Sequence, residues 1–451
     1  MKKSIHWRRT VEVCVALSML ILLNLTGSRT NASPTPIEHI IVITQQNHSF
    51  DNYFGTYPGA NGIPRDASIP ENPFDLGSNL IKPFPLDSEP KMEFHNGWQY
   101  AHAAYNDGQM NGFVNAQNED ENSKLCMGFY SEKNIPMYWK LAREFVLFDN
   151  YFSSAMADSF PNMLYLIAGQ NGGIRWGSPS TLEVLASIQL TTVFDMLEEK
   201  DVSWKYYIGR YEKVLNSTSD KTPSAAYWAP IVSIPRFQSD PQLSSKIVDQ
   251  EQFYEDAFTG SLPQVCFVLP SPVDHPGSTT LLRAQSKTMS FVDSVMNSKY
   301  WQSSVIFILW DDYGGWYDHV PPRQVDRYGY GFRVPMILIS SYAKEGYVSH
   351  VEHDHTSILK FILDTYELPS LSERVKIANS MADAFDFTKA RQPSSVFLQP
   401  STLQPTNPDV VNRVWTLYAL LPSFAIGLAI VMLYKKRERR HSLSQRLSES
   451  A

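Results

Sequence analysis

The sequence has 451 residues, of which 43% are hydrophobic, 19% are charged and only three are cysteines. This composition excludes an intrinsically disordered chain, a disulfide-rich scaffold and a coiled coil, and it leaves enough apolar residues for a large core. Lys and Arg gather near the two termini, so the body between them is more acidic than the net charge of −7 indicates. An acidic body has no general affinity for a phosphate backbone, so we expect no nucleic-acid partner.

The N-terminus has the pattern of a signal peptide. Four basic residues precede a mostly apolar run of 13 residues, from Val13 to Leu25, and small polar residues follow as far as Ala32. A charged start, a short apolar run and a small residue at the cleavage site are typical of secreted proteins. The run is also short for a membrane span. We therefore assign residues 1–32 to a signal peptide.

Apolar runs in the body predict four buried strands, and helical patterns lie between them. The strands are expected at residues 37–44, 265–269, 304–310 and 334–340, and the helices at residues 159–168, 279–297 and 355–368. Strands that are almost continuously apolar and alternate with helices favour a mainly parallel sheet with both faces covered. The sequence therefore predicts an α/β fold.

Polar side chains follow three of these strands. Gln46 and Asn47 come after the first strand, His275 after the second, and Asp311 and Asp312 after the third. Such sheets bind ligands beyond the carboxyl ends of their strands, so we expect these residues to lie close together. Carboxylate and amide oxygens suit a divalent cation. A simple turn stays open as an alternative, because turns also favour Asp, Asn and Gly.

Other histidines lie in two further segments. His353, Asp354 and His355 open a predicted helix, and His102 lies in the run AHAAYNDGQMNGF. Imidazole can donate or accept a proton near neutral pH, so both segments are candidates for catalysis. The alternatives are a helix cap for the first segment and a solvated loop for the second.

Several blocks of the body resemble one known family, in order, from about residue 37 to residue 387. The clearest are IEHIIVITQQNHSFDNYFGTYPGANG from Ile37, WDDYGGWYDHVPP from Trp310 and GFRVPMILISSYAKEGYVSHVEHDHTSILKFI from Gly331. They are similar to the bacterial phosphoesterase family, which contains phospholipases C and acid phosphatases. AHAAYNDGQMNGF, DSFPNMLYLIAG and MADAFDF match more weakly. The resemblance implies an alkaline-phosphatase-like three-layer α/β/α sandwich for residues 33–390.

The resemblance also implies the catalytic residues. The family nucleophile stands two residues before a Pro-Asn pair, which places it at Ser159. A plain helix N-cap is the alternative for this serine. His275, His355 and His102 match family histidines that contact phosphate or protonate the leaving oxygen. We expect three further residues to contact the substrate, namely Asp354, His353 and Asn162.

The family metal site maps to Gln46, Asn47, Asp311 and Asp312. The resemblance implies one divalent ion, with calcium, zinc, magnesium and manganese all open. Gln46 and Asp312 stand where the family has Glu, so the site loses one negative charge and one methylene of reach and should bind metal more weakly. His48 also stands where the family has Arg. A catalytically impaired surface protein that binds a phosphorylated ligand is therefore the alternative function. A sulfatase-like or phosphomutase-like relative ranks last, because the chain lacks sequence blocks of either kind.

The C-terminal region has the pattern of a membrane anchor. Residues 391–413 form a spacer rich in Pro, Ser and Thr, and residues 414–434 are 21 uncharged, mostly apolar residues, roughly 31 Å long as a helix. The basic tail, residues 435–451, should stay in the cytoplasm. A buried core helix is the alternative.

Cys126 and Cys266 could form one disulfide in an exported body.

The sequence thus predicts a single-pass cell-membrane protein with an extracellular catalytic domain and a cytoplasmic C-terminus. The expected activity is hydrolysis of a phosphate monoester or a phospholipid head group, of phospholipase C or acid phosphatase type, through a phosphoserine. The acidic body disfavours polyanionic substrates and anionic membranes, which leaves small soluble phosphate esters or zwitterionic lipids.

Overall fold

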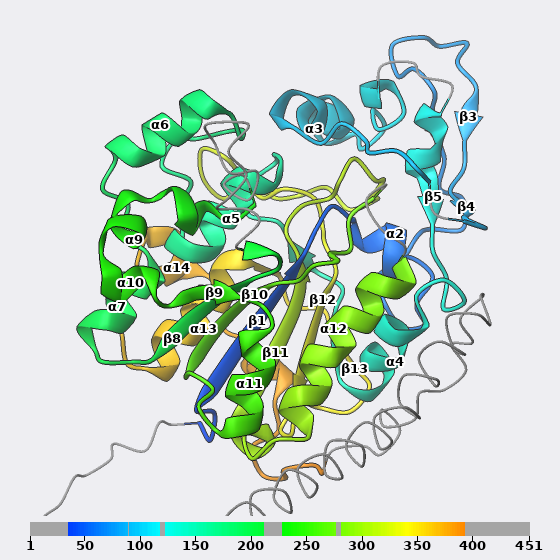
Figure 1. Cartoon of the computed structure of the whole chain (residues 1–451). Coiled ribbons are helices and arrows are strands. Elements are labelled where there is room, and N and C mark those ends of the chain that lie inside the picture. Colours follow the sequence, from blue (N-terminus) through cyan, green and yellow to red (C-terminus); the bar gives the residue numbers. More distant parts are fainter. Residues whose placement is uncertain (1–34, 89, 118–121, 212–227, 277–280, 393–451) are drawn as a thin grey trace, which may run out of the picture. The chain divides into compact units, whose positions relative to one another are not determined.

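The computed structural model describes residues 35–88, 90–117, 122–211, 228–276 and 281–392, and an eight-stranded sheet lies at its centre (Figure 1). The strands follow the order β13 (Tyr347–Ser349), β6 (Val146–Phe148), β12 (Met336–Ser340), β11 (Ser304–Trp310), β1 (His39–Gln45), β10 (Val265–Leu269), β8 (Trp204–Ile208) and β9 (Ile247–Asp249). All neighbours are parallel except β12, which runs antiparallel to both β11 and β6. The predicted α/β fold with a mainly parallel sheet is confirmed.

The four strands predicted from apolar runs all belong to this sheet. Strands β10 and β11 have the predicted bounds, and β1 and β12 differ from them by one or two residues. Strand β12 begins only after Pro335, because proline has no amide hydrogen to donate to a neighbouring strand. All seven residues of β1 are buried, which explains why its central residues 40–43 are all apolar rather than alternating with polar ones.

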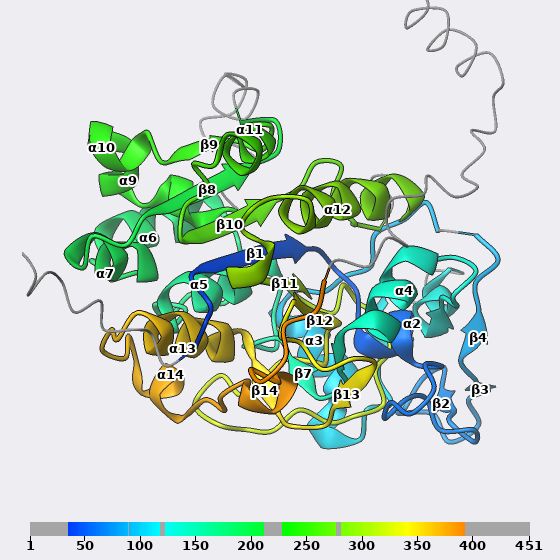
Figure 2. The ribbon, with the colours of Figure 1, turned by 90° about the horizontal axis from the view of Figure 1, so that it is seen from below.

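Helices cover both faces of the sheet. Figures 1 and 2 show α11 and α12 on one face and α5 and α13 together on the opposite face. The helices are α2 (Phe50–Phe54), α3 (Trp98–Tyr105), α4 (Pro136–Glu144), α5 (Ser159–Ala168), α6 (Pro179–Ser187), α7 (Val193–Glu199), α9 (Pro235–Ser239), α10 (Pro241–Ser244), α11 (Gln252–Thr259), α12 (Leu281–Met296), α13 (His355–Thr365) and α14 (Glu373–Ile377). The three helices predicted from sequence correspond to α5, α12 and α13.

Three pairs of short strands lie outside the central sheet. They are β2 (Ile69–Pro70) with β3 (Leu80–Ile81), β4 (Phe84–Pro85) with β5 (Gly128–Phe129), and β7 (Tyr151–Phe152) with β14 (His353–Asp354). The first two pairs and α3 belong to a chain segment at the end of the molecule toward which β1 runs (Figure 1). This segment brings additional side chains to that end of the sheet.

Several predictions concern residues outside the described part of the chain. They are the signal peptide, the membrane-spanning helix, the cytoplasmic tail and nearly all of the spacer. Among the helices of the described residues, none is long and apolar enough to cross a bilayer. The sequence left open a disulfide between Cys126 and Cys266, and in the structure both cysteines are free. Burial raises the pKa of both thiols, so neither is a reactive thiolate.

Candidate active site

The carboxyl ends of β1 and β11 bring the predicted metal-binding residues together. The two strands pair in parallel with Gln45 opposite Trp310, so the residues that follow each strand meet. The carboxylate of Asp311 accepts hydrogen bonds at its Oδ1 from the backbone amide of Asn47, at 3.1 Å, and from that of Asp312, at 2.8 Å. The two polar turns are therefore joined through a single carboxylate oxygen.

Two unusual backbone conformations make this junction close. Asn47 has a φ of 63°, in the left-handed region that asparagine tolerates better than most residues. Gly314 also has a positive φ, and a Cβ atom there would lie 2.1 Å from the carbonyl oxygen of Asn47. Only glycine fits at position 314, which gives a physical reason for the glycine in the block WDDYGGWYDHVPP.

Ser159 enters the same site at the N-terminus of α5. The side chain of Asp158 caps this helix by accepting a hydrogen bond from the amide of Phe160. The hydroxyl of Ser159 lies 3.0 Å from Asp312 Oδ2, to which it donates, and 3.3 Å from Asn47 Oδ1. The serine therefore lies against the residues predicted to bind metal.

His275 completes this group from the end of β10. Its Nδ1 lies 2.8 Å from the carbonyl oxygen of Pro276 and must carry a hydrogen to bond there. In the neutral ring Nε2 is then an acceptor, and it lies 3.1 Å from the side-chain nitrogen of Asn47. The amide of Asn47 thus contacts His275 on one side and Ser159 on the other, so the two catalytic candidates share one positioning residue.

These residues line a pocket of about 420 Å³. Its walls come from loops after β1 and β10, from the segment before α3 and from the start of α5. The lining residues are Gln46, Asn47, Glu93, Asn96, Asp158, Ser159, Phe160, Gly177, Trp228, Val273 and His275. The pocket therefore brings together the predicted residues Gln46, Asn47, Ser159 and His275, with Asp312 bonded to the serine.

Asp311 and Asp312 have the properties of cation ligands. Both are fully buried, and burial raises the pKa of both carboxyls; the charge of Asp311 raises the pKa of Asp312 further. Asp311 Oδ2 has no hydrogen-bond partner, and within the described ranges neither carboxylate forms an ion pair. A buried carboxylate pair without a cation is unfavourable, so the oxygen-rich set fits a divalent metal.

A second acidic group fits a metal less well. Asp51, Asp318 and His319 carry ligand atoms within 4.8 Å of one another. However, the guanidinium of Arg333 already lies between the carboxylates, 3.0 Å from Asp51 Oδ1 and 2.9 Å from Asp318 Oδ1. Burial raises the pKa of Asp318 to about 6 and Arg333 opposes the shift, so both groups are charged at neutral pH. The arginine supplies the positive charge that a metal would otherwise bring.

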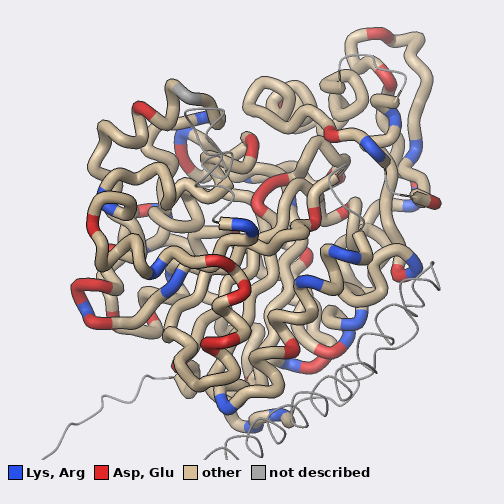
Figure 3. Tube along the Cα trace, in the orientation of Figure 1, with Lys and Arg blue, Asp and Glu red and all other residues tan. Residues whose placement is uncertain are grey.

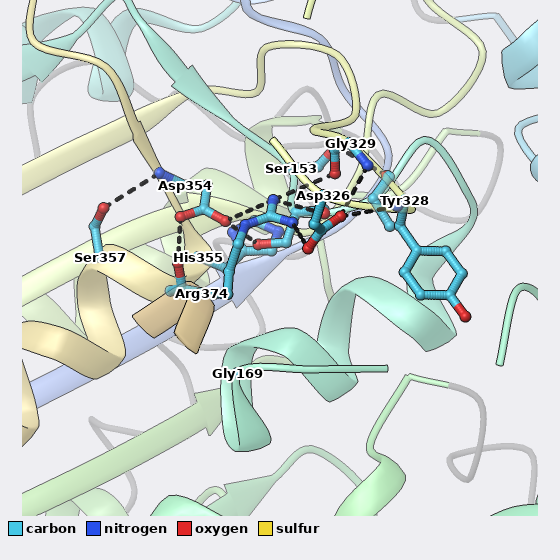
Figure 4. Close-up of polar contacts among 12 residues, drawn as sticks. Ser153, Gly169, Asp326, Tyr328, Gly329, Asp354, His355, Ser357 and Arg374 are labelled. Carbon is cyan, nitrogen blue, oxygen red and sulfur yellow. Dashed lines mark hydrogen bonds and ion pairs between the residues drawn. The ribbon is translucent and has the colours of Figure 1, made fainter. Parts of the chain in front are cut away.

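The structure does not place Asp354 in the pocket. Asp354 caps α13, where its backbone amide donates to Ser357 Oγ, and its carboxylate accepts hydrogen bonds from Ser154 and from Arg374 at 2.7 and 3.2 Å (Figure 4). Arg374 in turn forms an ion pair with Asp326 at 2.6 Å. These contacts of Asp354 are structural, so its predicted role in substrate binding does not fit its position.

His355 also lies beneath the pocket rather than in it. It is fully buried, with Nδ1 3.0 Å from the hydroxyl of Tyr151 and Nε2 2.8 Å from the carbonyl oxygen of Asp311. Burial lowers the pKa of His355 to about 4, so the ring is neutral at physiological pH. Its predicted role as a proton donor to the leaving group does not fit this position. The ring supports the Asp311 turn from below.

Two further predicted histidines have other roles in the structure. His353 is buried against Phe148, with Nδ1 3.3 Å from Ser357 Oγ. His102 is exposed on α3, its Nδ1 lies 2.8 Å from the carbonyl oxygen of Trp98, and it does not line the pocket. Neither histidine reaches the group around Ser159.

Asn162 holds the turn that leads to Ser159 and does not line the pocket. Its Oδ1 accepts from the amide of Ala155 at 2.8 Å, and its Nδ2 lies 3.1 and 3.0 Å from the carbonyl oxygens of Ala157 and Asp158. It is fully buried. We therefore replace the expected substrate contact with a positioning role for Asn162.

Several pocket residues were missed from sequence. The side-chain nitrogen of Asn96 donates to Asp312 Oδ1 at 2.9 Å, and Glu93 Oε1 lies 3.7 Å from His275 Nδ1. Asn96 precedes Gly97 in a loop and belongs to no distinctive sequence pattern, so the sequence did not indicate it. Trp228 comes from a region without recognisable sequence blocks.

Comparisons with known proteins identify the family of the chain. Residues 37–369 match the model of the Phosphoesterase family, so the chain belongs to this family and is a phosphoric ester hydrolase. Phospholipase C A of Mycobacterium tuberculosis is 27% identical over 412 residues, which cover 78% of each chain. Non-hemolytic phospholipase C of Pseudomonas aeruginosa is 24% identical over 450 residues, covering 84% of this chain and 62% of that protein.

A plant protein and a solved structure are also similar. Non-specific phospholipase C3 of Arabidopsis thaliana is 24% identical over 422 residues, covering 83% of this chain and 78% of that protein. The crystal structure of a protein in the alkaline phosphatase superfamily from Vibrio parahaemolyticus aligns with a TM-score of 0.35 and 8% identity, over 78% of this chain and 74% of that one.

Proposed function

We propose that the chain hydrolyses phosphate esters in two steps, with Ser159 as the nucleophile. The observation that carries this proposal is the position of the Ser159 hydroxyl, which donates to Asp312 at 3.0 Å in a pocket that also contains His275. A plain helix cap does not require the hydroxyl to contact a buried carboxylate pair. In the first step the Ser159 oxygen bonds to phosphorus and passes its hydrogen to Asp312, while the bond from phosphorus to the alcohol breaks. In the second step water breaks the phosphoserine bond, which returns a hydrogen to Ser159 and releases the phosphate.

Each neighbouring residue has a role in this scheme. Asp312 accepts the hydrogen bond of the Ser159 hydroxyl and orients its oxygen toward the pocket. The backbone amides in the first turn of α5 stabilise the phosphoryl oxygens. In its doubly protonated form, His275 would give its Nε2 proton to the leaving alcohol. The side chain of Asn47, which contacts both the ring and the serine, sets their separation.

The proposed metal ligands are Asn47, Asp311, Asp312 and Gln46. A divalent ion bound there would neutralise charge on the phosphoryl group and favour the ionised form of the serine hydroxyl. The donor set consists of oxygen atoms, which calcium, magnesium and manganese prefer, while zinc remains open.

We propose a phospholipid head group as the substrate, which would make the enzyme a phospholipase C rather than an acid phosphatase. The curated relatives named above, which are phospholipases C, support this choice. Phe160, Trp228 and Val273 add apolar side chains to the otherwise polar lining of the pocket. A phosphate monoester is the alternative.

We further propose the setting in which the enzyme acts. Residues 33–390 would form an alkaline-phosphatase-like α/β/α domain outside the cell, following a signal peptide at 1–32. Residues 391–413 would be a spacer and residues 414–434 a single membrane span, with the tail 435–451 in the cytoplasm. The apolar run and its basic flank support this arrangement.

The test measures release of p-nitrophenol from p-nitrophenyl phosphate and from p-nitrophenyl phosphorylcholine by the full chain. The proposal predicts release that requires Ser159, is lost with a chelator and returns with divalent metal. A preference for the phosphorylcholine ester would support phospholipase C, and a preference for the monoester would support acid phosphatase. Undiminished release by Ser159→Ala would contradict the nucleophile.

Gln46 favours one second candidate, a surface protein that binds a phosphorylated ligand without turnover. Gln46 lines the pocket where the family has a glutamate, so the site has one negative charge fewer. Stabilisation of the chain against heat by phosphorylcholine, without dye release, would support this candidate. If the chain binds the ligand without turnover because of Gln46 alone, Gln46→Glu should restore turnover.

A further inference from the structure

A hairpin outside the pocket carries three exposed apolar side chains. We define the apolar hairpin as residues 69–81, which contain β2 and β3 and the turn between them. Phe74 is 77% exposed, Leu76 is 108% exposed and Leu80 is 66% exposed. Other large exposed apolar residues among the described segments, such as Phe258 at 92%, stand further apart in the sequence. A cluster of this kind marks an interaction surface, whereas single exposed residues need no explanation.

Hydrogen bonds inside the apolar hairpin hold these side chains outward. The amide of Glu71 donates to the carbonyl oxygen of Asn79 at 2.8 Å, and the amide of Ser78 donates to that of Asp75 at 3.0 Å. At the base, Ile69 is buried, and Glu71 forms an ion pair with Lys124 at 2.8 Å. The exposure is therefore a property of an ordered turn.

The apolar hairpin lies at the functional end of the molecule. Figure 1 shows β3 at the end toward which β1 runs, beyond α3. The pocket lies at the carboxyl ends of β1 and β10, and Glu93 and Asn96 in its wall come from the segment between the hairpin and α3. A flat surface that contacts the hairpin tip would consequently face the same end of the molecule as the pocket.

The charge near the tip indicates what kind of surface it fits. Asp75 lies between Phe74 and Leu76, and the ammonium of Lys124 is already paired with Glu71. Figure 3 shows Lys and Arg scattered among acidic residues over the described part of the chain. The exposed Lys82 follows directly after the hairpin, so acidic and basic side chains are both present beside the tip. Binding to anionic lipid uses clustered basic residues, so an apolar tip of mixed charge suits an uncharged or zwitterionic surface.

We propose that the apolar hairpin inserts Phe74, Leu76 and Leu80 into the interface of a zwitterionic phospholipid bilayer and so docks the pocket against it. This inference rests on the proposed phospholipid substrate and on the predicted membrane span at residues 414–434, which would keep the domain beside a bilayer. The hairpin adds the orientation that a spacer alone cannot provide, because it fixes which end of the domain faces the lipid.

The test places a fluorescent probe on the full chain in phosphatidylcholine vesicles. Leu80→Cys is labelled with an environment-sensitive dye in a Cys14→Ser background, because Cys126 and Cys266 are buried and should not react. The matched control is Phe258→Cys, because Phe258 is also an exposed apolar residue but lies on α11. Two quenchers of the dye are compared, one attached to the lipid and the other, iodide, dissolved in the water.

The proposal predicts that the dye at position 80 shifts to shorter wavelength, is quenched from the lipid and is protected from iodide. The dye at position 258 should show none of these changes. Phe74→Ser/Leu76→Ser should abolish the changes at position 80. Equal accessibility of both dyes to iodide would overturn the proposal, as would protection of position 80 without vesicles, which would indicate a second copy of the chain. Stronger quenching with phosphatidylserine than with phosphatidylcholine would also contradict it.

A parallel assay separates this inference from the proposed function. The double variant Phe74→Ser/Leu76→Ser should hydrolyse p-nitrophenyl phosphorylcholine, which is soluble in water, at the unchanged rate. The reason is that the hairpin does not line the pocket. Loss of that activity would show a structural role and overturn the proposal. If the wild type lacks turnover altogether, the fluorescence result still decides whether the hairpin enters lipid.

Discussion

The chain contains two buried pairs of carboxylates that differ in how their charge is balanced. Asp51 and Asp318 lie against Arg333, which is fully buried and bonded to both of them. Asp311 and Asp312 are just as buried, but no cationic side chain of the described ranges pairs with them, and one oxygen of Asp311 has no partner. The first pair forms a complete ion network, whereas the second requires a charge from outside the chain.

This difference helps to separate structural acids from functional ones. Removing one partner of a buried ion pair leaves an uncompensated charge, so Arg333 and its carboxylates should govern stability. A buried carboxylate pair without a cation already opposes folding, so it is retained for a purpose other than stability. The hydroxyl of Ser159 contacts the second pair and not the first.

Replacing the cation of the structural pair should have the largest effect. Arg333→Met leaves Asp51 and Asp318 buried without a partner, and we expect a loss of roughly 3–5 kcal/mol in the free energy of unfolding. Denaturant titration measures this loss. Arg143→Met is the matched control, because Arg143 pairs with Glu132 on the surface and should cost less than about 1 kcal/mol. Similar losses in both variants would contradict the structural role of Arg333.

Changing a carboxylate of the functional pair should separate activity from stability. Asp312→Asn should lower turnover roughly 10²–10³-fold, because the serine loses its charged acceptor. The same change removes like-charge repulsion, so the free energy of unfolding should stay constant or rise. Asp318→Asn should do the reverse, losing stability and retaining turnover per folded molecule. Unfolding of the protein by Asp312→Asn would contradict the assignment of Asp312 to function rather than to stability.

Metal binding should distinguish the two pairs directly. A divalent ion at a hundred times its dissociation constant should stabilise the chelator-treated chain by about 2.7 kcal/mol. Asp311→Asn/Asp312→Asn should lose this stabilisation, and Asp318→Asn should keep it. Calorimetric or thermal melts over a metal series provide the measurement. Loss of the shift in Asp318→Asn alone would place the metal at the other pair.

Of the four predicted changes, replacement of Asn162, which holds the turn before Ser159, should have the smallest effect. Asn162→Ala frees the turn from 155 to 158, and we expect kcat to fall roughly tenfold with KM little changed, because the serine is held less well. A rise in KM at constant kcat would instead indicate the direct substrate contact expected from sequence. Melting curves provide the control for folding.

The strands that position the site could be predicted from sequence. Strands β1, β10 and β11 are buried on both faces, so their residues form uninterrupted apolar runs that polar residues end abruptly. Parallel neighbours have their carboxyl ends at one edge, which brought Asn47, His275 and Asp311 together without knowledge of the structure. The antiparallel direction of β12 could not be predicted, because an apolar run carries no signal for direction.

Side-chain orientation was the part that sequence could not provide. Asp354 and His355 open a helix, and a polar residue there can cap the helix, support a turn or face a pocket with the same sequence pattern. Burial decided between these roles, and burial depends on which elements pack around α13. Glu93, Asn96 and Trp228 were missed because they lie in loops, where no periodicity marks the residues that reach the site.

The central claim is that Ser159 carries the phosphoryl group during turnover. The most direct test is to mix the full chain with p-nitrophenyl phosphorylcholine and metal, quench in acid during turnover and locate bound phosphate by peptide mass spectrometry. The account predicts phosphorylcholine or phosphate on Ser159 and none in Ser159→Ala. A modified residue elsewhere, or active turnover with Ser159 unmodified at every quench time, would contradict it.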